Sequence, residues 1–128
     1  METVKVVAAI IVKNNRILAA QRGYGECIGK WEFPGGKIKE GETSSEALKR
    51  EISEELSMKI IVKELITTEE FNYPDFHLSM QCFLCSSMDD PSLIEHLDAK
   101  WLSLNDLTRF EWLPADRKVV PIIQERLS

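Results

Sequence analysis

The sequence lacks a cluster of basic residues and lacks an apolar run long enough to cross a membrane. It has 16 Lys and Arg against 21 Asp and Glu, a formal net charge of −5. The longest apolar run near the start covers only residues 6–12, whereas a membrane-spanning helix needs about 20. Polymeric nucleic acid would be repelled on average, so a nucleic-acid-related ligand should be small and bound with the help of cations. With no signal peptide apparent, we expect a cytoplasmic protein without a membrane partner.

Cysteine is also scarce, with three residues in the chain. An odd number fits a reducing compartment. Cys82 and Cys85 form a C-x-x-C pair, which could suggest redox or zinc chemistry. They fall in an alternating stretch that we predict to be a strand, where a separation of three places two side chains on opposite faces. We therefore interpret them as packed thiols.

Internal repeats, linkers and low-complexity segments are absent, and a length of 128 residues predicts a single domain over residues 1–128. β-Branched and alternating segments predict strands at residues 4–12, 17–21, 59–71, 76–86 and about 99–102. A short extended piece, 31–33, should be stopped by Pro34-Gly35-Gly36. Helices are predicted at 43–56 and 114–127, the second with Pro114 in its first turn. This irregular order indicates an α/β (α+β) fold, a mixed sheet with helices on its faces.

The first predicted helix has a clear start signal and a clear buried side. Thr43 and Glu46 have the spacing of a capping box, in which each side chain bonds the backbone of the other. Leu48, Ile52 and Leu56 recur at helical spacing and form an apolar stripe directed at the core.

Three acidic residues, Glu51, Glu54 and Glu55, lie immediately beside that stripe, and no lysine lies within the acidic arc. Like charges at this spacing repel, and burial beside a packed surface increases the cost. One interpretation is a solvated acidic face; the other is a site for hard divalent cations, which carboxylate oxygens bind well. The glycines before the helix favour the second, because they let backbone groups approach a bound ion or phosphate closely.

These residues belong to a longer pattern, Gly36-x5-Glu42-x7-Arg50-Glu51-Ile52-x-Glu54-Glu55-x2-Met58. It resembles the Nudix box, the signature of hydrolases that act on nucleoside diphosphates linked to another moiety. The preceding segment, Trp31-Glu32-Phe33-Pro34-Gly35-Gly36-Lys37, resembles the MutT subgroup, which cleaves nucleoside triphosphates. One position departs from the pattern: Ser57 stands where the family usually has glycine. A left-handed helix cap at a non-glycine residue costs roughly 1 kcal/mol.

The resemblance implies a Nudix-type α/β/α sandwich and a role for each matching residue. The implied metal ligands are the carbonyl of Gly35 and the carboxylates of Glu51, Glu54, Glu55 and Glu95. Arg50 would orient Glu51, and Glu42 would stabilise the loop, although the pair Glu42 and Arg50 could instead be purely structural. Glu95 could instead be an ordinary surface residue. Arg22 and Lys37 are candidates for phosphate contacts.

The implied reaction converts a nucleoside triphosphate and water into the monophosphate and diphosphate, with attack at the β-phosphorus. Mg²⁺ is the expected cofactor, with Mn²⁺ as the alternative ion, because Mg²⁺ bridges carboxylates to phosphates and makes water acidic enough to attack phosphorus. The expected partner is a small nucleoside triphosphate and not polymeric nucleic acid. The protein should be a monomer or a homodimer.

The resemblance also places Tyr73, Leu78 and Asp116 around the base. MutT proteins that remove 8-oxo-dGTP typically carry asparagine where this chain has Asp116. An ionised carboxylate only accepts hydrogen bonds and suits the cytosine amino group. A cytidine-type nucleotide (CTP, dCTP or 5-modified dCTP) is therefore the first prediction.

Two alternatives to that function and one alternative role for Asp116 remain open. A protonated Asp116 could donate to guanine, which would make the protein an 8-oxo-dGTP diphosphatase. Alternatively, Asp116 could merely stabilise the start of its helix through its charge. The alternative of another class is a catalytically inactive Nudix-like recognition module.

Overall fold

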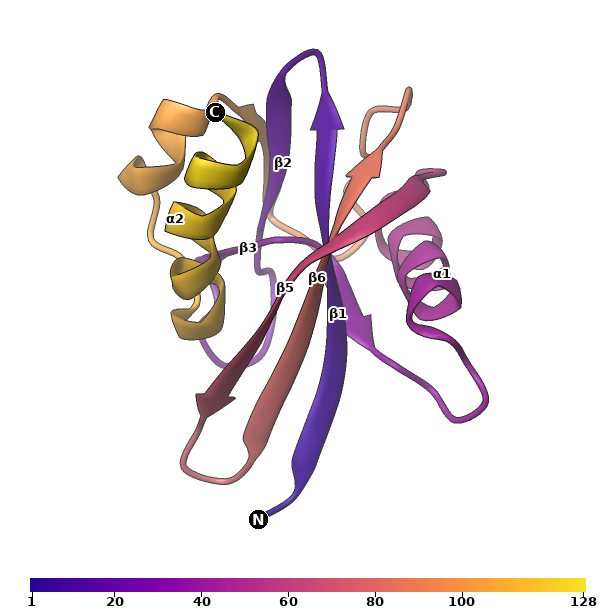
Figure 1. Ribbon diagram of the computed structural model, residues 1–128, viewed down its shortest axis with the longest axis vertical. Coiled ribbons are helices and arrows are strands. Elements are labelled where there is room, and N and C mark those ends of the chain that lie inside the picture. The colour runs from indigo at the N-terminus through magenta and orange to yellow at the C-terminus, as the bar shows by residue number, and fades with distance from the viewer.

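The computed structural model describes residues 1–128, and its centre is a mixed seven-stranded sheet (Figure 1). The strands are β1 (Thr3–Lys13), β2 (Arg16–Gln21), β3 (Trp31–Glu32), β4 (Gly35–Lys37), β5 (Ile61–Asn72), β6 (His77–Ser86) and β7 (Asp98–Leu102). The helices are α1 (Ser44–Leu56) and α2 (Pro114–Leu127), with a short 3-10 helix at Leu104–Arg109 that the sequence did not predict. The strand order is β3-β2-β1-β6-β5, with β4 paired to β1 and β7 to β2. Only the β1–β6 pair is parallel, which confirms the predicted mixed sheet.

The sheet separates two hydrophobic cores, one under each long helix. In Figure 1 the helices α1 and α2 flank the sheet on opposite sides. Alternate residues of β1 explain this division: Ala8 and Ile10 belong to the core beneath α2, whereas Ala9 and Ile11 belong to the core beneath α1. Successive strand residues point to opposite faces, so a strand covered on both sides reads as a continuous apolar run.

The cysteines of the C-x-x-C pair follow the same rule. Cys82 lies in the core on the α2 side and Cys85 in the core on the α1 side. Both thiols are buried and free. The prediction of two packed side chains on opposite faces is therefore confirmed, and burial raises the pKa of Cys85 to about 12.

Strand β4 was not predicted, because Pro34-Gly35-Gly36 was expected to end the extended segment. Instead Gly35–Lys37 pairs with β1 in the register Ala8↔Gly35 and Val6↔Lys37. Glycine is what permits this pairing: a Cβ on Gly35 would collide with the carbonyl oxygen of Val7. The absence of a side chain thus brings the backbone of residues 35–37 against β1 and beside α1.

Helix α1 begins and ends as the sequence indicates. Thr43 caps its start, with both bonds of the capping box to Glu46 present. Ser57 ends it in the left-handed conformation, with φ 53° and ψ 39°, and its N–H donates to the carbonyl of Ser53. Leu48, Ile52 and Leu56 are buried. The helix is therefore fixed along its apolar stripe and at both ends.

Helix α2 begins with Pro114 at its first turn, as predicted, and continues through an internal Pro121. No helix of the protein combines the length and the apolar character needed to cross a membrane.

Candidate active site

A cavity of about 810 Å³ opens between the start of β1, the β5–β6 hairpin and the first turn of α2. It brings together most of the site residues that the sequence predicts, although they are dispersed along the chain. The predicted residues that line it are Arg22, Gly35, Lys37, Glu51, Glu55, Tyr73, Leu78, Glu95 and Asp116. Arg50 and Glu54 are not among the lining residues, and the Glu54 side chain is 57% exposed.

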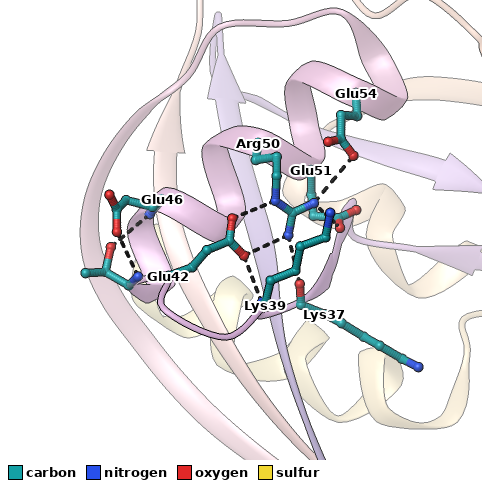
Figure 2. A network of polar contacts seen from close by, with 8 residues as sticks. Lys37, Lys39, Glu42, Glu46, Arg50, Glu51 and Glu54 are labelled. Atoms are coloured by element: carbon teal, nitrogen blue, oxygen red, sulfur yellow. Dashed lines mark hydrogen bonds and ion pairs between the residues drawn. The ribbon is translucent and has the colours of Figure 1, made fainter.

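Arg50 lies at the centre of a network of polar contacts on α1 and the loop before it (Figure 2). Its Nε and Nη2 donate to the two carboxylate oxygens of Glu42 at 2.6 and 2.9 Å. Its Nη1 donates to Glu51 at 2.7 Å and, less closely, to Glu54 at 3.4 Å. Nη2 also donates to the carbonyl oxygen of Lys37 at 3.0 Å. Bidentate arginine–carboxylate pairs fix geometry as well as charge, so Arg50 joins the loop to the acidic face.

The same network holds Glu42 ionised. The hydrogen bond from Arg50 lowers the pKa of Glu42 to about 2, with a further contribution from the Lys39 amide. Figure 2 shows the Lys37 side chain extending away from this network. Because Lys37 lines the cavity, its ammonium group is left available for an anionic ligand.

Gly36 leaves the space in which the Glu51 carboxylate lies. A Cβ at Gly36 would collide with that carboxylate, so glycine and glutamate are fitted to one another across β4 and α1. The Glu51 side chain is 14% exposed, and one of its oxygens is bound by Arg50. The loop and the helix thus place one box carboxylate at the cavity wall.

Glu55 is also largely buried, with 20% of its side chain exposed. Burial raises its pKa to about 7; the neighbouring His96 opposes this shift, and the charges of Glu51 and Glu32 add to it. A group of partly buried carboxylates that disfavour one another's ionisation would be stabilised by a cation. The donors are all carboxylate or carbonyl oxygens, which suits a hard divalent ion. In this conformation no three acidic, histidine or cysteine side chains already form a metal cage.

Glu95 faces the cavity from the segment before β7. Its charge is the main reason why the pKa of the Tyr24 hydroxyl is raised. A Cβ at Gly23 would collide with the carbonyl oxygen of Glu95. Two irregular segments, around Gly23 and around Glu95, are therefore packed together, and this packing sets the position of Glu95.

The sequence did not predict the chain of charged groups near Glu55, which links Arg22, Glu32 and His96. Glu32 accepts from Arg22 Nε at 3.2 Å through Oε1, and its Oε2 lies 2.9 Å from His96 Nε2. His96 Nε2 is also 4.0 Å from Glu55 Oε2. Burial lowers the pKa of His96, but the hydrogen bond and charge of Glu32 outweigh it, and the net shift is upward. The signals available in the sequence were the position of Glu32 within Trp31-Glu32-Phe33 and that of His96 beside Glu95.

Another part of the cavity wall is aromatic, with one buried carboxyl group. Asp116 is 5% exposed and accepts a hydrogen bond from the Phe33 amide at 2.9 Å. Burial raises the pKa of Asp116 to about 7, against the opposing hydrogen bond from Phe33. Tyr73 and Phe76 stack with ring centroids 5.0 Å apart, and Phe33 stacks on Trp112 at 4.5 Å. A flat aromatic ligand with polar edges would match this part of the wall.

Residues 2–122 match the NUDIX domain family. The chain belongs to this family. It is 31% identical to the CTP pyrophosphohydrolase of Escherichia coli K12 over 97% of this chain and 91% of that protein. It is also 31% identical to the 8-oxo-dGTP diphosphatase of the same organism, over 94% of this chain and 95% of that protein.

Two solved structures have the same fold. The solution structure of the E. coli ORF135 protein superimposes with a TM-score of 0.85 at 29% identity, covering 98% of this chain and 91% of the other. The MutT protein of methicillin-resistant Staphylococcus aureus 252 gives 0.79 at 38% identity, covering 98% and 99%. The predicted Nudix fold and hydrolase family are thereby confirmed. Nudix hydrolases generally use a divalent metal ion and act on small nucleotide substrates.

Proposed function

We propose that this Nudix hydrolase converts a nucleoside triphosphate and water into the nucleoside monophosphate and diphosphate. The observation that carries the proposal is the composition of the cavity. Acidic box residues and the basic residues Arg22 and Lys37 line it together with aromatic residues and Asp116. A nucleoside triphosphate has the matching sequence of groups, a dense anion joined to a flat base.

Mg²⁺, with Mn²⁺ as the alternative, is the proposed cofactor. Its ligands would be Glu51, Glu54, Glu55 and Glu95 together with the carbonyl oxygen of Gly35. When bound there, the ion would neutralise phosphate charge and make water acidic enough to attack phosphorus near neutral pH. An acidic protein needs this help, because its carboxylates would otherwise repel the triphosphate.

The protein's own residues have distinct proposed tasks around that ion. Arg50 holds Glu51 through a 2.7 Å hydrogen bond and fixes the loop through Glu42. A carboxylate of the box accepts the proton that water loses. Arg22 and Lys37 contact the phosphates, and Tyr73 and Leu78 line the space for the base.

A cytidine-type nucleotide, CTP, dCTP or 5-modified dCTP, is the proposed substrate. Ionised Asp116 offers acceptors only, and the cytosine amino group offers the donor that they require. The Phe33 amide, 2.9 Å from one oxygen, favours the ionised form. The similarity to a protein named CTP pyrophosphohydrolase supports the same choice.

A second candidate, 8-oxo-dGTP, rests on a specific observation. The pKa of Asp116 is raised to about 7 by burial, so the protonated carboxyl group, which donates a hydrogen bond to a purine, is accessible at neutral pH. Relatives named 8-oxo-dGTP diphosphatase match the chain at similar identity. The non-enzymatic recognition module is less well supported, because every acidic residue of the box is in place.

The decisive experiment is a turnover screen over natural, oxidised and methylated nucleoside triphosphates, each with Mg²⁺ and with excess chelator. We expect diphosphate and monophosphate in equal amounts, and no products in chelator. Reaction in heavy-oxygen water should place the label in the diphosphate if attack occurs at the β-phosphorus. Absence of diphosphate from every substrate would refute the enzymatic proposal and leave the recognition module.

A further inference from the structure

His96 lies in the cavity wall between two carboxylates on different elements. Its side chain is only 5% exposed. Its Nε2 is 2.9 Å from Glu32 Oε2, on β3, and 4.0 Å from Glu55 Oε2, on α1. The other ring nitrogen, Nδ1, is buried and has no hydrogen-bond partner.

These contacts determine which nitrogen carries hydrogen. A carboxylate oxygen at 2.9 Å must accept, so Nε2 carries hydrogen whether the ring is neutral or charged. In the neutral ring Nδ1 is then an acceptor without a donor. An unpaired buried polar atom costs free energy that an apolar ring of similar size would avoid. The contacts of Nε2 with Glu32 and Glu55, and not Nδ1, therefore account for an imidazole at position 96.

Glu32 binds His96 from strand β3 of the sheet. One of its oxygens, Oε1, is bound by Arg22 and the other, Oε2, by His96. The Glu32 side chain is 16% exposed, and its backbone is paired to Ala20 of β2. His96, by contrast, lies in an irregular segment. The bond to Glu32 thus ties that segment to the sheet.

We propose that His96, braced by Glu32, is a positioning residue whose Nε2–H group, 4.0 Å from Glu55 Oε2, attracts the Glu55 carboxylate toward the cavity. Glu55 lies at the end of a flexible side chain and carries the charge closest to His96 Nε2 after that of Glu32. Attraction across this gap favours rotamers of Glu55 that face the site. The inference rests on the proposed function in one respect, that Glu55 takes part in hydrolysis.

Two substitutions separate the role of Nε2 from simple filling of space. A glutamine amide nitrogen can occupy the place of Nε2 and donate two hydrogen bonds, whereas a shorter asparagine amide places its nitrogen near Nδ1. We expect H96N to lower kcat by about tenfold to a hundredfold, the range for residues that orient a metal ligand, with KM nearly unchanged. H96Q should recover most of that loss. H77N, at the other histidine of the chain, is the matched control.

Equal losses in H96Q and H96N would overturn the inference, because they would indicate packing by the ring alone. Wild-type kcat in H96N would overturn it as well, since Nε2 would then have no task. A rise in KM without a change in kcat would also overturn the inference, because His96 would then contribute to substrate binding and not to the position of Glu55.

A measurement without turnover keeps this test separate from the proposed function. In nitrogen-15 histidine spectra of the wild-type protein, His96 should show hydrogen on Nε2, and the signal should move in both E32Q and E55Q while that of His77 stays. Hydrogen on Nδ1 alone, or a His96 signal indifferent to E55Q, would contradict the proposed contact. If these spectra agree but no substrate releases diphosphate, the proposed function fails and the contact stands.

Discussion

Two parts of the cavity wall differ in how their charged groups are paired: the part formed by the box residues, the box end, and the part around Asp116, the base end. At the box end, Arg50 makes five hydrogen bonds to side chains and backbone around it, and charge is balanced by charge. At the base end, Asp116 is buried with one amide donor, from Phe33, among aromatic rings. At the box end Arg50 lowers the pKa of Glu42 to about 2, although burial raises that of Glu55 to about 7. At the base end burial raises the pKa of Asp116 to about 7 with no arginine bound to it. Rate should therefore depend on the box end and selectivity on the base end.

The largest expected effect is loss of a box carboxylate. E54Q and E55Q should each fold normally and lower turnover by at least about a hundredfold, because each removes a charged ligand from the proposed metal site. Diphosphate release measures the effect, and E125Q, on an exposed part of α2, is the control. Activity in excess chelator, or rates near that of the wild type in both variants, would contradict the metal site.

A smaller effect should follow from loosening the box network. R50K keeps the charge but loses the planar fork that binds both oxygens of Glu42 while also reaching Glu51. We expect kcat to fall about tenfold or more and the Mg²⁺ concentration for half activation to rise. If melting temperature falls while the dependence on Mg²⁺ is unchanged, the pair Glu42 and Arg50 is purely structural.

The buried Asp116 at the base end should make the free energy of unfolding depend on pH. Since burial raises the pKa of Asp116 from 3.8 to about 7, the folded protein binds this proton more tightly than the unfolded chain. Its contribution to stability is therefore greatest at low pH and is lost as pH rises from about 4 to about 7.

The comparison that isolates this contribution is between the wild type and D116N, whose amide cannot ionise. The melting temperature of D116N relative to wild type should increase across the window from pH 4 to pH 7, and the exposed variant D75N should show no such trend. A constant difference at every pH would mean that Asp116 ionises in the folded state as readily as in the unfolded chain.

The smallest effect on activity should come from the two buried cysteines, which belong to neither end. Each packs in its own core, so the double variant C82S/C85S should lose stability by a few kcal/mol at most and retain most of its turnover. Chemical denaturation and diphosphate release measure the two quantities. Lost activity with an intact fold would indicate a thiol role.

The sequence was informative about the box end because its contacts are local. The bonds from Arg50 reach Glu51, Glu54, Glu42 and Lys37, separations of at most 13 residues. The capping box and the left-handed Ser57 could be predicted for the same reason. The counter-charge of the acidic arc is Arg50, which the family resemblance indicated and the helical pattern alone did not.

The remaining features depend on contacts between distant parts of the chain. Asp116 and Phe33 are 83 residues apart, and His96 and Glu32 are 64 apart. Spacing in the sequence carries no information about such pairs. Strand β4 was missed because glycine disfavours strands in general, whereas here its missing side chain permits close pairing with β1. The exposure of Glu54, outside the cavity lining, was likewise not evident from its place in the pattern.

The most direct test of the division between the two ends is the ratio of kcat/KM for dCTP to kcat/KM for 8-oxo-dGTP in three proteins: wild type, E55Q and D116N. We predict that the wild type favours dCTP. E55Q should lower both values by the same factor and leave the ratio unchanged. D116N should shift the ratio toward 8-oxo-dGTP by about tenfold, the value of one good base contact. A wild type that strongly favours 8-oxo-dGTP would contradict recognition by an ionised Asp116. An unchanged ratio in D116N, or a changed one in E55Q, would contradict the division itself.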